Sequence, residues 1–151
     1  MRTIDIHSTG EHPANVLSNF YPHRFVMDGV ECACMEGFLQ SLKFKNPKKQ
    51  KQVCAMAGRD AKAAGSKKRL WKITGNIYWN GKKYARLTAP YTQLLRRAYK
   101  ELYTQSSEFN QAIKDTQDCI LTHARGKSDP QTTILTDWEF LNCLMYLRKL
   151  D

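Results

Sequence analysis

Three polar side chains share one side of a segment whose apolar residues predict a helix. Glu36, Gln40 and Lys43 are spaced i, i+4 and i+7, and at about 100° per residue this places them in one narrow stripe. The stripe runs beside the apolar face, where loss of water raises the pKa of a carboxyl group and lowers that of an amine. Such groups can transfer protons and attack carbon, although the same stripe is also typical of an ordinary solvated helix side.

Positive charge is concentrated in the middle of the chain. The 151 residues carry a formal net charge of +10, and 17 of the 24 Lys and Arg residues lie between Lys43 and Lys100, where Asp60 is the only acid. A field of one sign attracts polyanions, because each neutralised phosphate releases counterions. Nucleic acid or a phosphorylated nucleotide is the expected partner, and a basic surface that only aids solubility is the alternative.

Aromatic and basic residues interleave around an Asn-Gly pair at 80–81. This pair between β-favouring flanks predicts a two-residue hairpin. Aromatic rings can stack on exposed bases while lysines follow phosphates. The candidate nucleic-acid contacts on this hairpin are Trp79, Lys82, Lys83 and Arg86.

The five cysteines are an odd number and do not repeat a paired metal-ligand spacing with the four histidines. They are expected to be reduced, mostly buried thiols, so we predict neither a metal nor a cofactor. The alternative, a metal bound by Cys32 and Cys34 with His23 or His123, lacks the second paired ligand set that makes a zinc motif specific.

Length and pattern predict one domain over residues 1–151, of α+β class, mostly helical with a small antiparallel sheet. No long apolar run or secretory signal is evident, so a soluble cytoplasmic protein is expected. Apolar periodicity and turn residues predict helices over 35–42, 48–56, 59–64, 90–102, 107–114 and 137–150. They predict strands over 2–6, 24–26, 30–32 and 119–121, the last one buried, and a capping box over 136–139.

Four segments of the first 62 residues carry a family resemblance. They are Leu-Ser-Asn-Phe at 17–20, Asp-Gly at 28–29, Met-Glu-Gly-Phe-Leu-Gln-Ser-Leu-Lys-Phe at 35–44 and Gly-Arg-Asp-Ala-Lys at 58–62. In this order and spacing they closely resemble the NADAR family, the YbiA-like N-glycosidases. Residues 121–124 and 142–150 look like later family segments. The family's Trp-Gly pair is not evident between 124 and 138, and residues 71–90 look like an insertion.

The resemblance implies hydrolysis of an N-glycosidic bond, and the lack of a long apolar run predicts no membrane partner. Glu36 would stabilise positive charge at the ribose C1′ or activate water, and Lys43 would form a transient Schiff base or hold phosphate. The implied substrate-binding residues are Asn19, Phe20, Gln40, Arg59, Lys62 and His123. For Phe20 and His123, a purely structural role in the core is the alternative.

Three functions remain open from the sequence. The first is removal of ADP-ribose from guanine in DNA, which the basic segment and the aromatic hairpin favour. The second is the same chemistry on phosphorylated intermediates of riboflavin biosynthesis, which need only a few cations. The third is a non-catalytic module that binds ADP-ribose or nucleic acid.

Overall fold

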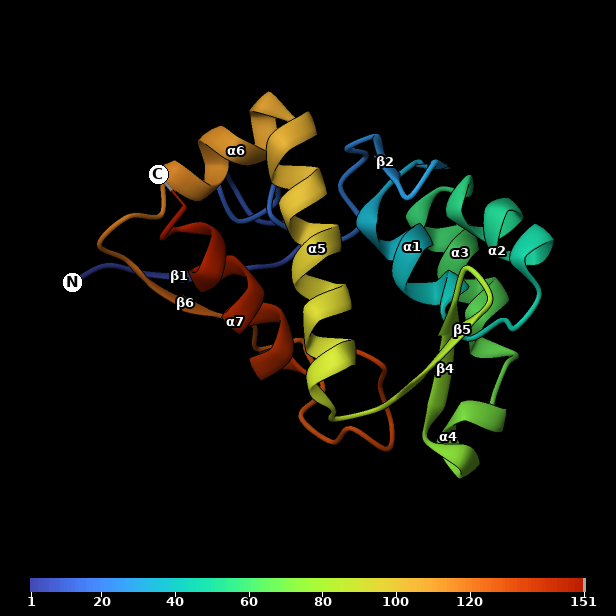
Figure 1. Ribbon diagram of the computed structural model, residues 1–151. Helices are drawn as coiled ribbons and strands as arrows, with labels where there is room; N and C mark the ends of the chain where they lie inside the picture. Colours follow the sequence, from blue (N-terminus) through green and yellow to red (C-terminus); the bar gives the residue numbers. More distant parts are fainter. Residues whose placement is uncertain (151) are drawn as a thin grey trace.

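The computed structural model describes residues 1–150 and has the expected α+β architecture (Figure 1). The helices within these residues are α1 (Met35–Ser41), α2 (Pro47–Cys54), α3 (Gly58–Ser66), α4 (Leu70–Thr74), α5 (Ala89–Gln105), α6 (Ser107–Lys114) and α7 (Asp137–Leu147). The strands are β1 (Thr3–Asp5), β2 (Phe25–Met27), β3 (Val30–Cys32), β4 (Asn76–Trp79), β5 (Lys82–Ala85) and β6 (Ile120–Thr122). No helix in the described part is long and apolar enough to span a bilayer.

Both predicted hairpins are confirmed. β2 pairs with β3 and β4 with β5, each antiparallel across a two-residue turn. Asp28 and Gly29 in the first turn, and Asn80 and Gly81 in the second, all have positive φ, as tight hairpin turns of this kind require.

A third pairing differs from expectation. β1 and β6 run parallel, with Ile4 opposite Leu121, so the sheet content is not purely antiparallel. Residue Ile120 at the start of β6 is exposed, because this two-stranded ladder lies at the edge of the molecule (Figure 1). The strand predicted at 119–121 is present as β6, but the prediction that it is buried was wrong.

Helix α5 is the central element of the core. Figure 1 shows it between α7, β1 and β6 on one side and the α1 to α3 group on the other. Its apolar positions recur with helical spacing and are all buried, as predicted from the sequence: Tyr91, Leu94, Leu95, Ala98, Tyr99 and Leu102. At the end of the chain, α7 begins with the predicted capping box between Thr136 and Glu139. All five cysteines are free, and four of them are buried.

Helix α1 is enclosed by its neighbours, and every residue in it is buried. It packs against α2 and α3. Gly37 makes the α2 contact possible, since a Cβ atom there would lie 2.8 Å from the carbonyl oxygen of Cys54. Glu36 and Gln40 are therefore held inside the protein rather than on a solvated helix side, and Lys43, just beyond α1, is half-buried.

Candidate active site

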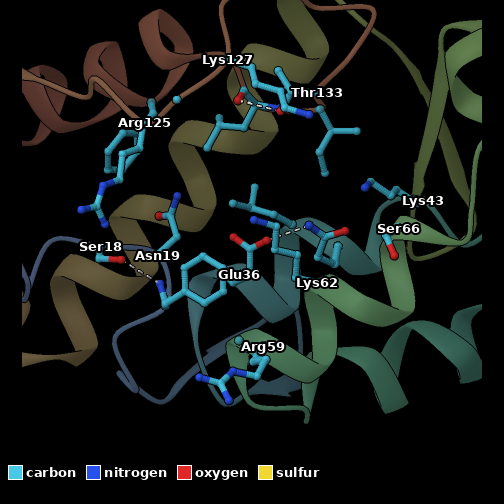
Figure 2. A pocket seen from close by; sticks show the side chains of 18 of the residues that line it. Ser18, Asn19, Glu36, Lys43, Arg59, Lys62, Ser66, Arg125, Lys127 and Thr133 are labelled. Carbon is cyan, nitrogen blue, oxygen red and sulfur yellow. Dashed lines mark hydrogen bonds between the residues drawn. The ribbon is translucent and has the colours of Figure 1, made fainter. Parts of the chain in front are cut away.

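A cleft of about 1000 Å³ opens between the α1 and α3 side of the molecule and the loop that follows β6. Figure 2 shows Glu36, Lys43, Lys62 and Arg59 on one side of this cleft and Lys127 and Thr133 on the other. Its lining includes every residue that the sequence suggested for catalysis or substrate binding: Asn19, Phe20, Glu36, Gln40, Lys43, Arg59, Lys62 and His123.

Glu36 and Gln40 form a buried hydrogen-bonded pair one helical turn apart. They are only 9% and 8% exposed, and Gln40 Nε2 donates to Glu36 Oε2 at 2.7 Å. Loss of water raises the pKa of Glu36, while the hydrogen bond from Gln40 and the charges of Lys62 and Lys43 act in the opposite direction. The site thus contains a carboxylate whose charge is costly and only partly compensated.

Gln40 is itself fixed by α3. A Cβ atom at Gly65 would overlap the Gln40 Oε1 atom, so only glycine allows α3 to approach this closely. The same Oε1 is buried and accepts no hydrogen bond within residues 1–150. Gln40 therefore presents one donor to Glu36, while its Oε1 is packed against Gly65 of α3.

Lys43 follows the last turn of α1 and reaches the cleft beside Trp71. Its Nζ lies 5.7 Å from the centre of the Trp71 ring. Burial lowers the pKa of Lys43 to about 8, with Glu36 acting to raise it and Lys72, Lys127 and Lys62 acting to lower it further. A useful fraction of this amine is therefore neutral, and nucleophilic, near neutral pH.

Asn19 connects the segment before β2 to the start of α1. Its carbonyl oxygen accepts from the backbone N–H of Glu36 at 3.0 Å, and its Oδ1 accepts from the hydroxyl of Tyr99 at 2.7 Å. The first bond fixes the backbone of Asn19, and the second orients its carboxamide so that the side-chain nitrogen is the group left to donate to a ligand. The geometry suits recognition of a ribose hydroxyl.

Phe20 lies at the surface of the cleft and not in the core. Its ring is 37% exposed, with Lys62 Nζ 5.6 Å from the ring centre. Gly58 allows the start of α3 to contact the Phe20 ring, because a Cβ atom at position 58 would lie 2.6 Å from Phe20 Cδ1. The structural alternative for Phe20 is therefore not supported, and the ring is free to stack on a ligand.

His123 is held by the fold and also lines the cleft. Its Nδ1 lies 2.8 Å from the carbonyl oxygen of Ile6, and because a carbonyl only accepts, Nδ1 is the protonated nitrogen. The ring packs edge-on against Phe140, with ring centres 5.0 Å apart. The fold thereby fixes the imidazole while it lines the cleft.

The cleft is strongly cationic. Eight Lys and Arg residues line it, and Glu36 is the only acid in the described lining. Sequence reasoning identified three of the eight and missed Lys68, Arg69, Lys72, Arg125 and Lys127. The last two lie two and four residues after His123, and the alternation of His, Arg and Lys at 123, 125 and 127 is the signal that could have revealed them. Anions are the ligands that such a surface favours.

The prediction that Trp79 contacts nucleic acid was wrong. Trp79 is 2% exposed. Its Nε1 donates to Asp28 at 2.8 Å, and its ring meets Phe38 edge-on. The ring is a core side chain and cannot stack on a base.

The same prediction was wrong for Arg86. Its side chain is buried and donates two hydrogen bonds to the Glu139 carboxylate, at 2.8 and 3.0 Å. It also donates to the carbonyl oxygen of Thr133, so it supports the loop that walls the cleft. Lys82 and Lys83 are exposed but lie outside the cleft lining.

The donor set of the cleft does not resemble a metal site. Among residues 1–150, no three His, Cys, Asp or Glu side chains come together as metal ligands. The polar atoms around Glu36 are instead mostly cationic, which suits a phosphorylated ligand.

Comparison with known proteins first identifies the fold. The structure of the E. coli protein YbiA superposes with a TM-score of 0.67 at 18% identity, covering 98% of this chain and 83% of that one. The two proteins therefore share a fold. Residues 11–149 match the family described as bacteriophage protein GP30.3, and the chain belongs to that family. An uncharacterized 17.1 kDa protein of Enterobacteria phage T4 is 32% identical over 149 residues, 98% of each chain.

Proposed function

We propose that this protein is an N-glycosidase of NADAR type, which hydrolyses a ribose–base bond to remove ADP-ribose from guanine in DNA. The observation that carries the proposal is Glu36, a nine-tenths buried carboxylate held by Gln40 at the centre of a cationic cleft. The shared YbiA fold and the motif resemblance over residues 17–62 support the same class.

The arrangement fits the chemistry of this reaction. As the bond to the base breaks, positive charge develops at the ribose C1′, and a desolvated carboxylate stabilises that charge strongly. Glu36 is the one acidic side chain among the described residues of the cleft. The bond from C1′ to the base is replaced by a bond to a water oxygen, and the water's proton passes to the departing nitrogen.

Lys43 offers a covalent version of the same reaction. The ribose ring opens, the neutral Lys43 amine displaces the base from C1′ to give an imine, and water then releases the sugar. The pKa of Lys43, lowered to about 8, supports this role. The alternative is that Lys43 stays protonated and holds a phosphate.

The cations around the cleft match the diphosphate of ADP-ribose. Arg59 and Lys62 lie in the first turns of α3, and Arg125 and Lys127 face them across the opening (Figure 2). Guanidinium and ammonium groups on both sides can bind the two phosphates while C1′ lies near Glu36. Asn19 and Phe20 are placed for the ribose and an aromatic base.

A small substrate is the second candidate, and one observation favours it. Trp79 and the Arg86 side chain are buried, so the hairpin presents less of the aromatic and basic surface that first suggested a DNA partner. The same chemistry on a phosphorylated intermediate of riboflavin biosynthesis needs only the cleft itself.

Product analysis separates these candidates. The purified protein is incubated with an oligonucleotide that carries ADP-ribosylated guanine and, separately, with the phosphorylated riboflavin intermediates, and products are resolved by mass spectrometry. We expect free ADP-ribose and unmodified DNA from the first substrate. Cleavage of the small substrate alone would establish the second candidate, and cleavage of neither would refute the proposed function.

A further inference from the structure

The short helix α4 exposes two apolar side chains. Leu70 is 69% exposed and Ile73 is 84% exposed, and their i, i+3 spacing places them on one face of the helix. Trp71, between them in sequence, is buried in the core and anchors the helix. Figure 1 shows α4 at one end of the molecule, beside β4. The Leu70 and Ile73 face therefore projects into solvent from a fixed base.

A second face of α4 belongs to the cleft. Arg69 and Lys72 are also three residues apart, and both line the cleft that contains Glu36. At about 100° per residue, the face of Arg69 and Lys72 is adjacent to that of Leu70 and Ile73. The surface of Arg69, Leu70, Lys72 and Ile73 forms a rim beside the cleft. A ligand that fills the cleft and continues over this rim meets two cations and then two apolar side chains.

We propose that α4 is a docking element for the DNA strand that flanks the reacting nucleotide. Arg69 and Lys72 bind phosphates of the strand, and Leu70 and Ile73 pack against the sugar and base beyond them. The inference rests on the proposed function and deepens it, because it makes the substrate a polymer that is held outside the catalytic cleft as well as within it.

Neither a membrane nor a second copy of the chain fits this face as well. Two apolar side chains on a five-residue helix bury far less area than the amphipathic helices that hold proteins on membranes. In a symmetric dimer through α4, the cations at 67–69 and 72 would approach the same cations of the partner and repel them. A DNA strand supplies both anionic and apolar groups.

The test removes the apolar groups without changing charge. In the double variant Leu70→Gln/Ile73→Gln, both positions keep a good helix former. Met145→Gln, at an exposed position of α7 outside the cleft lining, is the matched control. Binding of a fluorescent, unmodified single-stranded DNA oligonucleotide is followed by anisotropy at low salt. Hydrolysis of ADP-ribosylated guanosine, free and within an oligonucleotide, is measured in parallel.

We expect the double variant to bind the oligonucleotide about tenfold more weakly than the wild type, because two apolar contacts are lost. The control should bind normally, and hydrolysis of the free nucleoside should be unchanged in both. Equal affinity of the double variant and the wild type would overturn the proposal, as would a loss confined to binding of anionic lipid vesicles or to self-association. If the wild type hydrolyses neither substrate, the proposed function fails, and the anisotropy comparison still decides the role of α4.

Discussion

The negative charge of Glu36 carries a cost that the fold does not fully offset, and this has a measurable consequence for stability. Burial raises its pKa above the value of 4.5 that it has in water, so the folded state disfavours the charge that the unfolded state carries freely. Stability is therefore lost as pH rises from that value through the folded pKa, and the loss persists at neutral pH.

Glu36→Gln should remove this cost while keeping the shape of the side chain. At pH 7 we expect the variant to melt about 2–5 °C higher than the wild type, as relief of a strained active-site group commonly allows. Thermal unfolding followed by circular dichroism measures the difference, which should shrink as the pH is lowered, because protonation removes the buried charge. A variant less stable than the wild type at pH 7 would argue against an uncompensated charge.

Lys43 can be tested as a nucleophile through a substitution that keeps its charge. With the pKa lowered to about 8, about a tenth of the amine is neutral at pH 7. We expect borohydride to trap a sugar adduct on the wild type during turnover, detected by mass spectrometry, and Lys43→Arg to be inactive and untrapped. Substantial activity in Lys43→Arg would show instead that only the positive charge is needed, for phosphate binding.

At the scale of elements, α3 fixes the geometry of α1 through Gly65. We expect Gly65→Ala to lower kcat, because its new Cβ displaces Gln40 from Glu36, while the better helix propensity of Ala limits any loss of stability. If the effect passes through Gln40, adding Gly65→Ala to Gln40→Ala should lower kcat no further. Additive losses, measured by steady-state kinetics, would contradict this coupling.

The β4–β5 hairpin shows that local sequence signals determine a turn but not which side chains beside it are buried. Asn-Gly at 80–81 was enough to predict the β4–β5 hairpin, because the turn geometry is local. Which face of that hairpin is buried depends on α1, whose Phe38 contacts Trp79, and on α7, whose Glu139 binds Arg86. These partners lie more than 40 residues away from the hairpin side chains they contact, so residue type alone pointed to a nucleic-acid surface where the fold needs a core.

The candidate site was predictable to a similar extent. Glu36, Gln40 and Lys43 lie on one helix, so their spacing located them together. Arg125 and Lys127 reach the same cleft only because β6 pairs with β1 and α7 packs on α5. No periodicity within the chain reports that kind of long-range contact.

At the scale of the whole molecule, the cationic cleft and rim should dominate DNA affinity. Each contact between a cation and a phosphate of a single strand contributes about 0.7 to the slope of log affinity against log salt. We expect a slope of about −2 or steeper for an oligonucleotide, measured by anisotropy, and a much shallower one for free ADP-ribose, which has only two phosphates. Equal shallow slopes would favour the small-molecule substrate.

The proposed glycosidase activity depends above all on the Glu36 carboxylate in the cleft. The most direct test is a single-turnover assay of free ADP-ribosylated guanosine with the wild type and Glu36→Gln, resolved by chromatography, because this substrate needs the cleft and not the DNA-docking rim. We predict release of ADP-ribose by the wild type and a loss of at least about a hundredfold in the variant, as for removal of a group that stabilises transition-state charge. Hydrolysis by Glu36→Gln at the wild-type rate would contradict the account.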